Sequence, residues 1–210
     1  MIFRQGVWKG ISLPAFLIAL LLIGSQAAAH EPQPRITPGK AERRELSLPI
    51  PNFFLTSQKG KPFGLHNHRG KIVLVSFMYT SCPDICPLIT TNLRQVQKGL
   101  RSGERSSIFI LSITTDPEID SPPVLKSYAE RYRVDFSNWS FLTGEEKRLA
   151  PVWKAFGVKV QKKARGLIDH TSLTALVDGK GIMRFVYHGT SPDSTVILKD
   201  LRTLIAQSAK

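Results

Sequence analysis

Cysteine is scarce in this chain, and so is negative charge. Among its 210 residues are two cysteines, and 29 lysines and arginines stand against 16 acidic residues, for a net charge of +13. So few cysteines exclude a disulfide-rich scaffold, and near-average glycine and proline contents exclude collagen-like and mucin-like chains. Apolar residues make up 42% of the chain, which is enough to form a core and excludes wholesale disorder.

The excess of positive charge bears on solubility and on partners, but not on the fold. The sequence has no zinc-finger spacing, no helix-turn-helix pattern and no aromatic RNA-binding motif. We therefore expect no nucleic acid among the partners of this protein.

The apolar run from Ile11 to Ile23 is short for a membrane span. Arg4 and Lys9 precede it, and Ala27-Ala28-Ala29 follow it. A basic start, a short apolar centre and small residues at the end predict a signal peptide over residues 1–29, cut after Ala29. The alternative is an uncleaved membrane anchor, because the stretch from Val7 to Ala29 reaches the roughly 20 residues that a span needs. Both alternatives export the rest of the chain, to the periplasm of a bacterial cell.

Residues 30–48 are polar and rich in proline, so we predict a linker there. In residues 49–210, runs at 71–78 and 107–113 predict strands that are buried on both faces. Apolar spacing and capping residues predict helices over residues 87–100, 121–132, 143–157 and 191–206. The runs at 172–177 and 182–187 flank Asp178-Gly-Lys-Gly181 and predict a hairpin. This order indicates one α/β domain with a central mixed sheet.

The two cysteines occur in Cys82-Pro-Asp-Ile-Cys86-Pro87, between a predicted buried strand and a predicted helix. Pro87 suits the first position of that helix. A helix N-terminus stabilises a thiolate, and ligands of α/β proteins bind beyond the ends of the strands. The spacing also lets both sulfurs hold one soft metal ion, copper(I) or zinc.

A purely structural disulfide between Cys82 and Cys86 would close a very small loop and would restrain the unfolded chain only modestly. A redox or a metal role is therefore favoured, and the pair alone does not separate the two. A metal site needs a further ligand, and five histidines are available: His30, His66, His68, His170 and His188. His170 precedes a predicted strand, but composition by itself does not single it out as a ligand.

Four motifs carry a family resemblance: Met78-Tyr-Thr-Ser-Cys-Pro-Asp-Ile-Cys-Pro87, Thr114-Thr-Asp-Pro-Glu-Ile-Asp-Ser-Pro122, Phe141-Leu-Thr-Gly144 and Asp169-His-Thr171. In content and order they resemble the motifs of the Sco/SenC family, over about residues 48–207. The resemblance implies a thioredoxin-like three-layer fold for residues 49–210, with the late hairpin. It also implies a copper protein that assists assembly of cytochrome c oxidase.

The resemblance implies Cys82, Cys86 and His170 as the copper ligands, and such a set suits copper(I) and accepts copper(II). Asp169 then either orients the imidazole or is a turn residue.

The expected function is delivery of copper to the copper A centre of the copper-binding oxidase subunit. The alternative is a thiol–disulfide oxidoreductase that keeps the oxidase cysteines reduced, with Cys82 and Cys86 as its redox pair. A thiol peroxidase is a weaker third option, suggested by Thr80. A copper donor protein and a membrane surface are further candidate partners.

Several residues stay open at this stage. Where the family usually has Asp-Leu-Arg-Gly-Lys, this chain has His66-Asn-His-Arg-Gly-Lys71. His66 and His68 would share one side of a strand, either as an accessory metal site or, as we favour, as exposed polar residues. His30 would become the new amino terminus, either a copper chelator or, as favoured, an unordered end. We expect His188 and Asp84 in turns, and Asp116 and Asp120 shaping a loop.

The segment before His170 is basic, with Lys159, Lys162, Lys163 and Arg165. It either steers an acidic partner toward the metal site or is a solvated connection.

Overall fold

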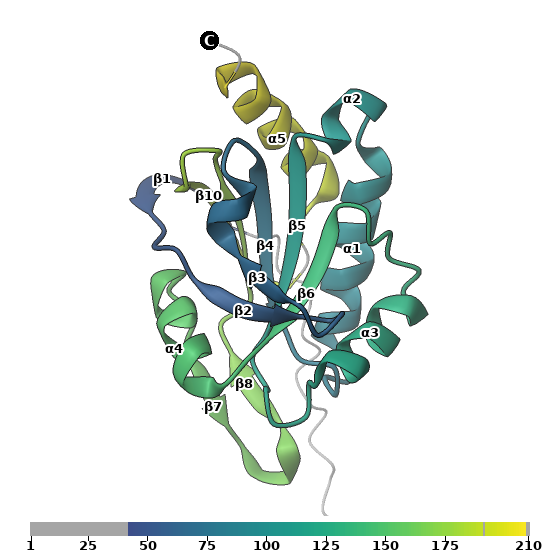
Figure 1. The fold of residues 1–210 in the computed structure, drawn as a ribbon. Helices are drawn as coiled ribbons and strands as arrows, with labels where there is room; N and C mark the ends of the chain where they lie inside the picture. The colour runs from purple at the N-terminus through teal and green to yellow at the C-terminus, as the bar shows by residue number, and fades with distance from the viewer. Residues whose placement is uncertain (1–41, 191, 209–210) are drawn as a thin grey trace, which may run out of the picture. The chain divides into compact units, whose positions relative to one another are not determined.

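The computed structural model describes residues 42–190 and 192–208 (Figure 1). The strands are β1 (Glu42–Pro49), β2 (Phe54–Ser57), β3 (Pro62–Gly64), β4 (Ile72–Met78), β5 (Ile108–Thr114), β6 (Trp139–Thr143), β7 (Val160–Lys162), β8 (Ile168–His170), β9 (Leu173–Val177) and β10 (Ile182–His188). The helices are α1 (Ile85–Gly99), α2 (Ser102–Arg105), α3 (Pro122–Arg131), α4 (Glu146–Ala155) and α5 (Ser194–Ser208), with 3-10 turns at Leu65–His68 and Ala164–Gly166.

Eight of the strands form one mixed sheet, in the order β1-β10-β9-β4-β5-β6-β2-β3. The central strands β4, β5 and β6 run parallel, as expected where helices connect them. Strand β9 is antiparallel to β4, and β10 is antiparallel to β9 across the predicted hairpin. The structure thus confirms the central mixed sheet and the late hairpin.

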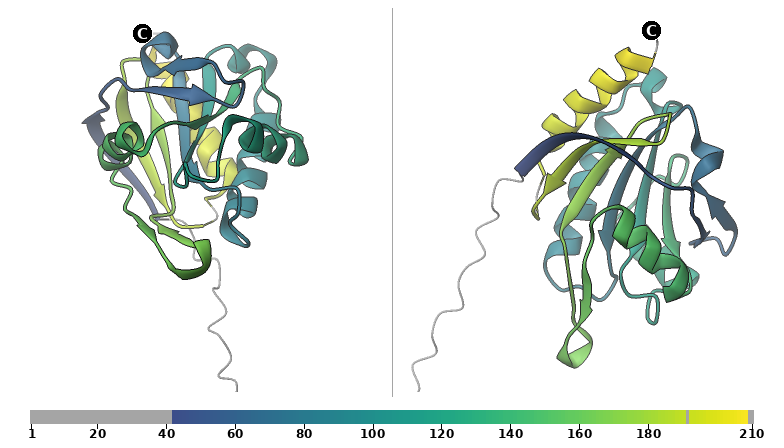
Figure 2. Two further views of the ribbon diagram at one scale, coloured as in Figure 1. Left: turned by 60° about the horizontal axis from the view of Figure 1, so that its bottom comes forward. Right: turned by 90° about the vertical axis from the view of Figure 1, so that its left-hand side faces the viewer.

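Helices cover both faces of the sheet, so the domain has three layers (Figure 2). Alternate side chains of β4 enter the two cores, because successive residues of a strand point to opposite faces. Ile72 and Leu74 pack in one core with residues of α1, α3 and α5, whereas Val73 and Val75 pack in the other with residues of α4. The burial of every β4 residue accounts for the apolar run that predicted this strand.

Three helices begin at other residues than predicted, and one of them is α5, which spans Ser194–Ser208 and not residues 191–206. Helix α1 begins at Ile85, with Asp84 as its N-cap residue, and not at Pro87. Helix α4 begins at Glu146 after Glu145, whereas Thr143 ends strand β6. The shift in α1 matters for the site, because it places Cys86 in the first helical turn, where backbone N–H groups have no partner within the helix.

The sheet begins inside the segment that we predicted as a linker. Residues Glu42–Pro49 pair with β10 as an antiparallel edge strand. The Arg43 guanidinium holds the buried Asp200 carboxylate of α5 through Nε at 2.7 Å and Nη2 at 3.0 Å, and the Tyr187 hydroxyl donates to the same carboxylate at 2.6 Å. This contact between side chains far apart in sequence fastens β1 to the domain. Most of the predicted linker, and all of the predicted signal peptide, lie outside the described residues.

Strands β7 and β8 form a separate two-stranded ribbon, which projects beyond the main sheet (Figure 2). His170 is the last residue of β8, so this ribbon carries it. In the part of the chain that the structure describes, no helix combines the length and apolar character required to cross a membrane.

Candidate metal centre

The two cysteines follow the carboxyl end of β4, and neither is in a disulfide. Cys86 is fully buried in α1, whereas Cys82 in the preceding loop is partly exposed. The backbone N–H of Cys86 donates to the Cys82 sulfur at 3.4 Å. The start of α1 thus aims its free N–H groups at one sulfur, an arrangement that favours a thiolate.

The environment moves the pKa values of the two thiols in opposite directions. The Cys86 thiol, which donates to the Cys82 sulfur, is the largest cause that lowers the pKa of Cys82 to about 5; the backbone N–H groups of residues 84–86 add to it against the cost of burial. The same hydrogen bond, burial and the Cys82 charge raise the pKa of Cys86. At neutral pH the pair therefore consists of one thiolate, Cys82, and one thiol, Cys86.

A buried carboxylate holds the start of the cysteine loop. Asp120 is fully buried, and it accepts the backbone N–H of Thr80 at 3.2 Å, the Thr80 hydroxyl, and the Thr114 hydroxyl at 2.6 Å. Burial raises the pKa of Asp120, and the bonds from the two threonines oppose this. Asp120 thus links the loop that follows β5 to the loop that follows β4. Asp116 is also buried, and its carbonyl oxygen accepts the Asp120 backbone N–H.

His170 lies beside the cysteine loop with one ring nitrogen committed. Its Nδ1 atom is 3.1 Å from the Thr171 carbonyl oxygen, which can only accept, so Nδ1 carries the proton and donates. Burial lowers the pKa of His170, against the opposing effects of Thr171, of the Cys82 charge and of Asp169. The neutral ring keeps a free lone pair on Nε2, the form that binds a metal ion.

Tyr79 contacts both His170 and the cysteine loop, and sequence reasoning did not identify it. Its ring meets the His170 ring edge-on, with centroids 5.9 Å apart, and its carbonyl oxygen accepts the Cys82 backbone N–H at 3.3 Å. Among the described residues, no three His, Cys, Asp or Glu side chains are already clustered to hold a metal ion. The structure therefore brings the three predicted ligands to one end of the domain without assembling them around one point.

A family comparison agrees with this layout. The model of the SCO1/SenC family matches residues 41–206. This chain belongs to the SCO1/SenC family.

Solved structures of SCO1/SenC proteins share its fold. A SCO1/SenC family lipoprotein from Bacillus anthracis has a TM-score of 0.71 at 30% identity, over 77% of this chain and 98% of that one. BsSco, described with a disulfide switch as a member of the Sco family of cytochrome c oxidase assembly proteins, has a TM-score of 0.66 at 31% identity, over 77% and 95%. Bradyrhizobium japonicum ScoI with copper bound has a TM-score of 0.63 at 28% identity, over 74% and 98%. The thioredoxin-like fold that the resemblance implied is therefore confirmed.

The remaining predicted residues of this SCO1/SenC domain have separate surroundings. The exposed Asp169 carboxylate is 3.7 Å from Lys163 Nζ, while the His170 ring bonds to Thr171, so a role of Asp169 in orienting the ring stays a prediction. Lys162 is also paired, with Glu118 at 2.5 Å and Glu146 at 3.6 Å. These two lysines of the basic segment thus have carboxylate partners within the domain.

The other histidines lie elsewhere. His66 and His68 belong to the 3-10 turn Leu65–His68, not to a strand, so the geometry that we expected for them was wrong. His68 is half-buried, with its ring centroid 4.8 Å from that of Phe63 and 4.0 Å from that of Phe109. His188 ends strand β10 and is not in a turn, and His30 lies outside the described residues.

Proposed function

We propose that this chain is an exported copper-binding protein that delivers copper to the copper A centre of cytochrome c oxidase, with Cys82, Cys86 and His170 as its ligands. The observation that carries the proposal is the donor set at the end of β4. The Cys82 thiolate accepts the Cys86 backbone N–H beside the Cys86 thiol, and a neutral imidazole with a free Nε2, that of His170, contacts the Tyr79 ring next to the cysteine loop. The copper bound by the relative ScoI supports the same cargo.

The chemistry of the donors suits copper. Two soft sulfurs and one imidazole favour copper(I), and they also accept copper(II). Binding releases the proton that Cys86 holds, because a thiolate and not a thiol is the ligand. His170 needs to leave its contact with Tyr79 and approach the sulfurs, and the ribbon β7–β8 that carries it is separate from the main sheet. A copper ion with only three protein ligands can accept a ligand from another protein, and so it can pass to that protein by ligand exchange.

The test is the copper stoichiometry of the reduced protein, measured by competition with a chromophoric copper(I) chelator. We expect a single copper ion per chain in the wild type and loss of tight binding in Cys82→Ala/Cys86→Ala. His188→Ala serves as the matched histidine control and should bind like the wild type. Equal, weak binding by the wild type and the double variant would refute copper delivery by these residues.

A thiol–disulfide oxidoreductase is the second candidate function. It is favoured by the low pKa of Cys82, about 5, directly beside a second thiol, and by the disulfide switch described for BsSco. In this function the thiolate attacks a partner disulfide and Cys86 resolves the mixed disulfide. His170→Ala separates the two functions: copper binding should weaken at least tenfold, whereas the rate of disulfide exchange should stay within twofold of the wild type.

A thiol peroxidase is not supported. The Thr80 hydroxyl that suggested it donates to the buried Asp120 carboxylate, so it is already committed within the fold. We do not retain this third option.

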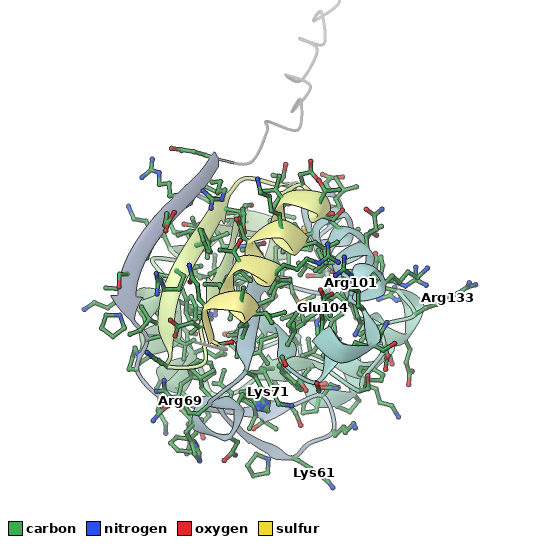
Figure 3. The ribbon with its side chains drawn as sticks, turned by 90° about the horizontal axis from the view of Figure 1, so that it is seen from above. Lys61, Arg69, Lys71, Arg101, Glu104 and Arg133 are labelled. Atoms are coloured by element: carbon green, nitrogen blue, oxygen red, sulfur yellow. The ribbon has the colours of Figure 1, made fainter. Side chains whose placement is uncertain are left out.

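For the setting of this function, we propose export to the periplasm, by the signal peptide or anchor predicted over residues 1–29. The proposed partners are the copper-binding oxidase subunit and a copper donor protein. Figure 3 looks onto the end of the domain away from the β7–β8 ribbon, where Lys61, Arg69 and Arg101 are exposed. These charges suit contact of that end with an anionic membrane surface, which would leave the cysteines facing the partner.

A further inference from the structure

A groove of about 350 Å³ lies beside the cysteine loop. Ser81, directly before Cys82, lines it together with Ile119 and Leu167. Ile119 is in the loop that follows β5, and Leu167 is in the connection between β7 and β8. Segments that are distant in sequence thus meet around one hollow next to the partly exposed Cys82.

Two large apolar side chains of this groove face solvent. Ile119 is 53% exposed, and Leu167 is 46% exposed. Neither belongs to the two cores of the domain, so packing within the fold does not account for them. Single exposed apolar residues are common on protein surfaces, whereas a pair that lines one concave site indicates a binding surface.

Contacts within the domain join the segments that form the groove. Asp120, next to Ile119, accepts the backbone N–H of Thr80 at 3.2 Å and so links this segment to the cysteine loop. Glu118, on the other side of Ile119, accepts from Lys162 of β7 at 2.5 Å and links the segment to the β7–β8 ribbon. The groove is therefore formed before any partner binds.

The lysines that line the groove already have acidic partners. Lys162 is paired with Glu118 and, at 3.6 Å, with Glu146, and Lys163 Nζ lies 3.7 Å from the Asp169 carboxylate. An acidic ligand would have to compete with these carboxylates for the lysines. The charge balance of the described residues thus matches an uncharged occupant, which contacts the apolar side chains.

We propose that the groove defined by Ser81, Ile119 and Leu167 binds an apolar side chain that flanks a cysteine of the partner protein. The inference rests on the proposed function, because copper delivery and disulfide exchange both bring a partner sulfur to Cys82. Contact in the groove holds that sulfur at Cys82 and so speeds the transfer. Large aliphatic and aromatic side chains suit the groove, because they gain the most free energy from burial.

The experiment uses the reduced, metal-free full chain and three blocked peptides, Phe-Cys-Phe, Gly-Cys-Gly and Glu-Cys-Glu. The cysteine of each peptide is disulfide-bonded to thionitrobenzoate. Cys82 attacks the peptide sulfur, and thionitrobenzoate leaves with the electron pair of the broken S–S bond. Cys86 then displaces the peptide, so that the protein dithiol becomes a disulfide and the peptide disulfide becomes two thiols. The colour of the released thionitrobenzoate gives the rate constant at pH 7.

We expect the wild type to react about tenfold faster with the Phe-flanked peptide than with the Gly-flanked peptide, because the groove buries part of a phenylalanine side chain. Ile119→Ser/Leu167→Ser should lose this preference and react with the two peptides at rates within twofold of each other. Its rate with iodoacetamide, a reagent too small to need the groove, should match that of the wild type. This second rate separates lost docking from lost reactivity of Cys82.

Leu88→Ser is the matched control. Leu88 is 52% exposed and lies two residues after Cys86, but it is not among the residues that line the groove. This variant should keep the tenfold preference. A wild-type preference below twofold, or an equal loss of preference in Leu88→Ser, would overturn the groove as the binding site. A fastest reaction with the Glu-flanked peptide would also overturn it, because the basic segment would then select an acidic partner.

Copper binding by the same proteins is measured separately, so the two proposals can fail independently. A wild type that shows the peptide preference but binds no copper would refute copper delivery and leave the groove in place. A wild type that binds copper without the peptide preference would refute the groove alone.

Discussion

Cys86 donates its backbone N–H to the Cys82 sulfur across 3.4 Å, and the neighbouring Cys86 thiol is the largest cause that lowers the pKa of Cys82. The two cysteines are therefore chemically unequal, although both lie at the same turn of the chain. Cys82 is the partly exposed thiolate, and Cys86 is the buried thiol. In either proposed function, Cys82 is the sulfur that we expect the copper donor or the partner disulfide to meet first.

Because Cys82 is a thiolate and Cys86 a thiol, we expect an alkylating reagent to react with Cys82 and not with Cys86. In the reduced protein at pH 6, iodoacetamide should modify Cys82 and leave Cys86 unmodified, because only Cys82 is a thiolate above its pKa of about 5. Peptide mass spectrometry after brief labelling gives the extent at each cysteine. Labelling of Cys82 that appears only above pH 8 would contradict the low pKa.

The low pKa of Cys82 also links stability to pH. Because the folded state lowers this pKa from the ordinary value of 9.0 to about 5, the unfolded chain binds more protons between these values. The resulting stabilisation is fully present above pH 9 and is lost as the pH falls toward 5. In urea unfolding of the reduced protein, the advantage of the wild type over Cys82→Ala should grow from pH 5 to pH 8. A constant difference across this range would refute the linkage.

Because Asp120 is buried and accepts hydrogen bonds from threonines, we expect Thr114→Val and Thr174→Val to change the free energy of unfolding by different amounts. Thr114→Val removes the 2.6 Å hydrogen bond to Asp120 and the 2.9 Å hydrogen bond that the hydroxyl accepts from the Asp116 backbone N–H. It should destabilise the protein by about 1.5–3 kcal/mol, because the Asp120 acceptor is charged and buried. Thr174→Val is the matched control in β9: its buried hydroxyl has no hydrogen-bond partner among the described residues. The control should be neutral or stabilising. Equal losses in urea unfolding would argue against a special role of the Asp120 contacts.

The first strand should be an integral part of the domain. Arg43→Ala removes the two hydrogen bonds to the buried Asp200 and should cost about 1–3 kcal/mol of unfolding free energy. Arg44→Ala, next in sequence, removes an exposed pair with Glu42 and should have almost no effect. Urea unfolding of both variants measures the difference. If Arg43→Ala is as stable as Arg44→Ala, β1 is not fastened through Asp200.

The order of the elements around the cysteines could be predicted from the sequence, because it depends on local patterns. The apolar run of β4, the hairpin at Asp178–Gly181 and the helix after the cysteines follow from strand and helix periodicity and from turn residues. The exact start of α1 could not be predicted, because Pro87 is acceptable at the first helical position and also two residues later. Tertiary packing placed Asp84 as the N-cap and Cys86 inside the first turn.

The sequence by itself determined the nature of the donors, two cysteines on one turn and a histidine in a motif far along the chain, together with the family that they resemble. Only the tertiary structure decided what surrounds them. Tyr79 against His170, Asp120 under Thr80 and Arg43 on Asp200 join segments that are distant in sequence. Such contacts depend on which strands become neighbours in the sheet, and this arises from the burial of the two cores and not from any local pattern.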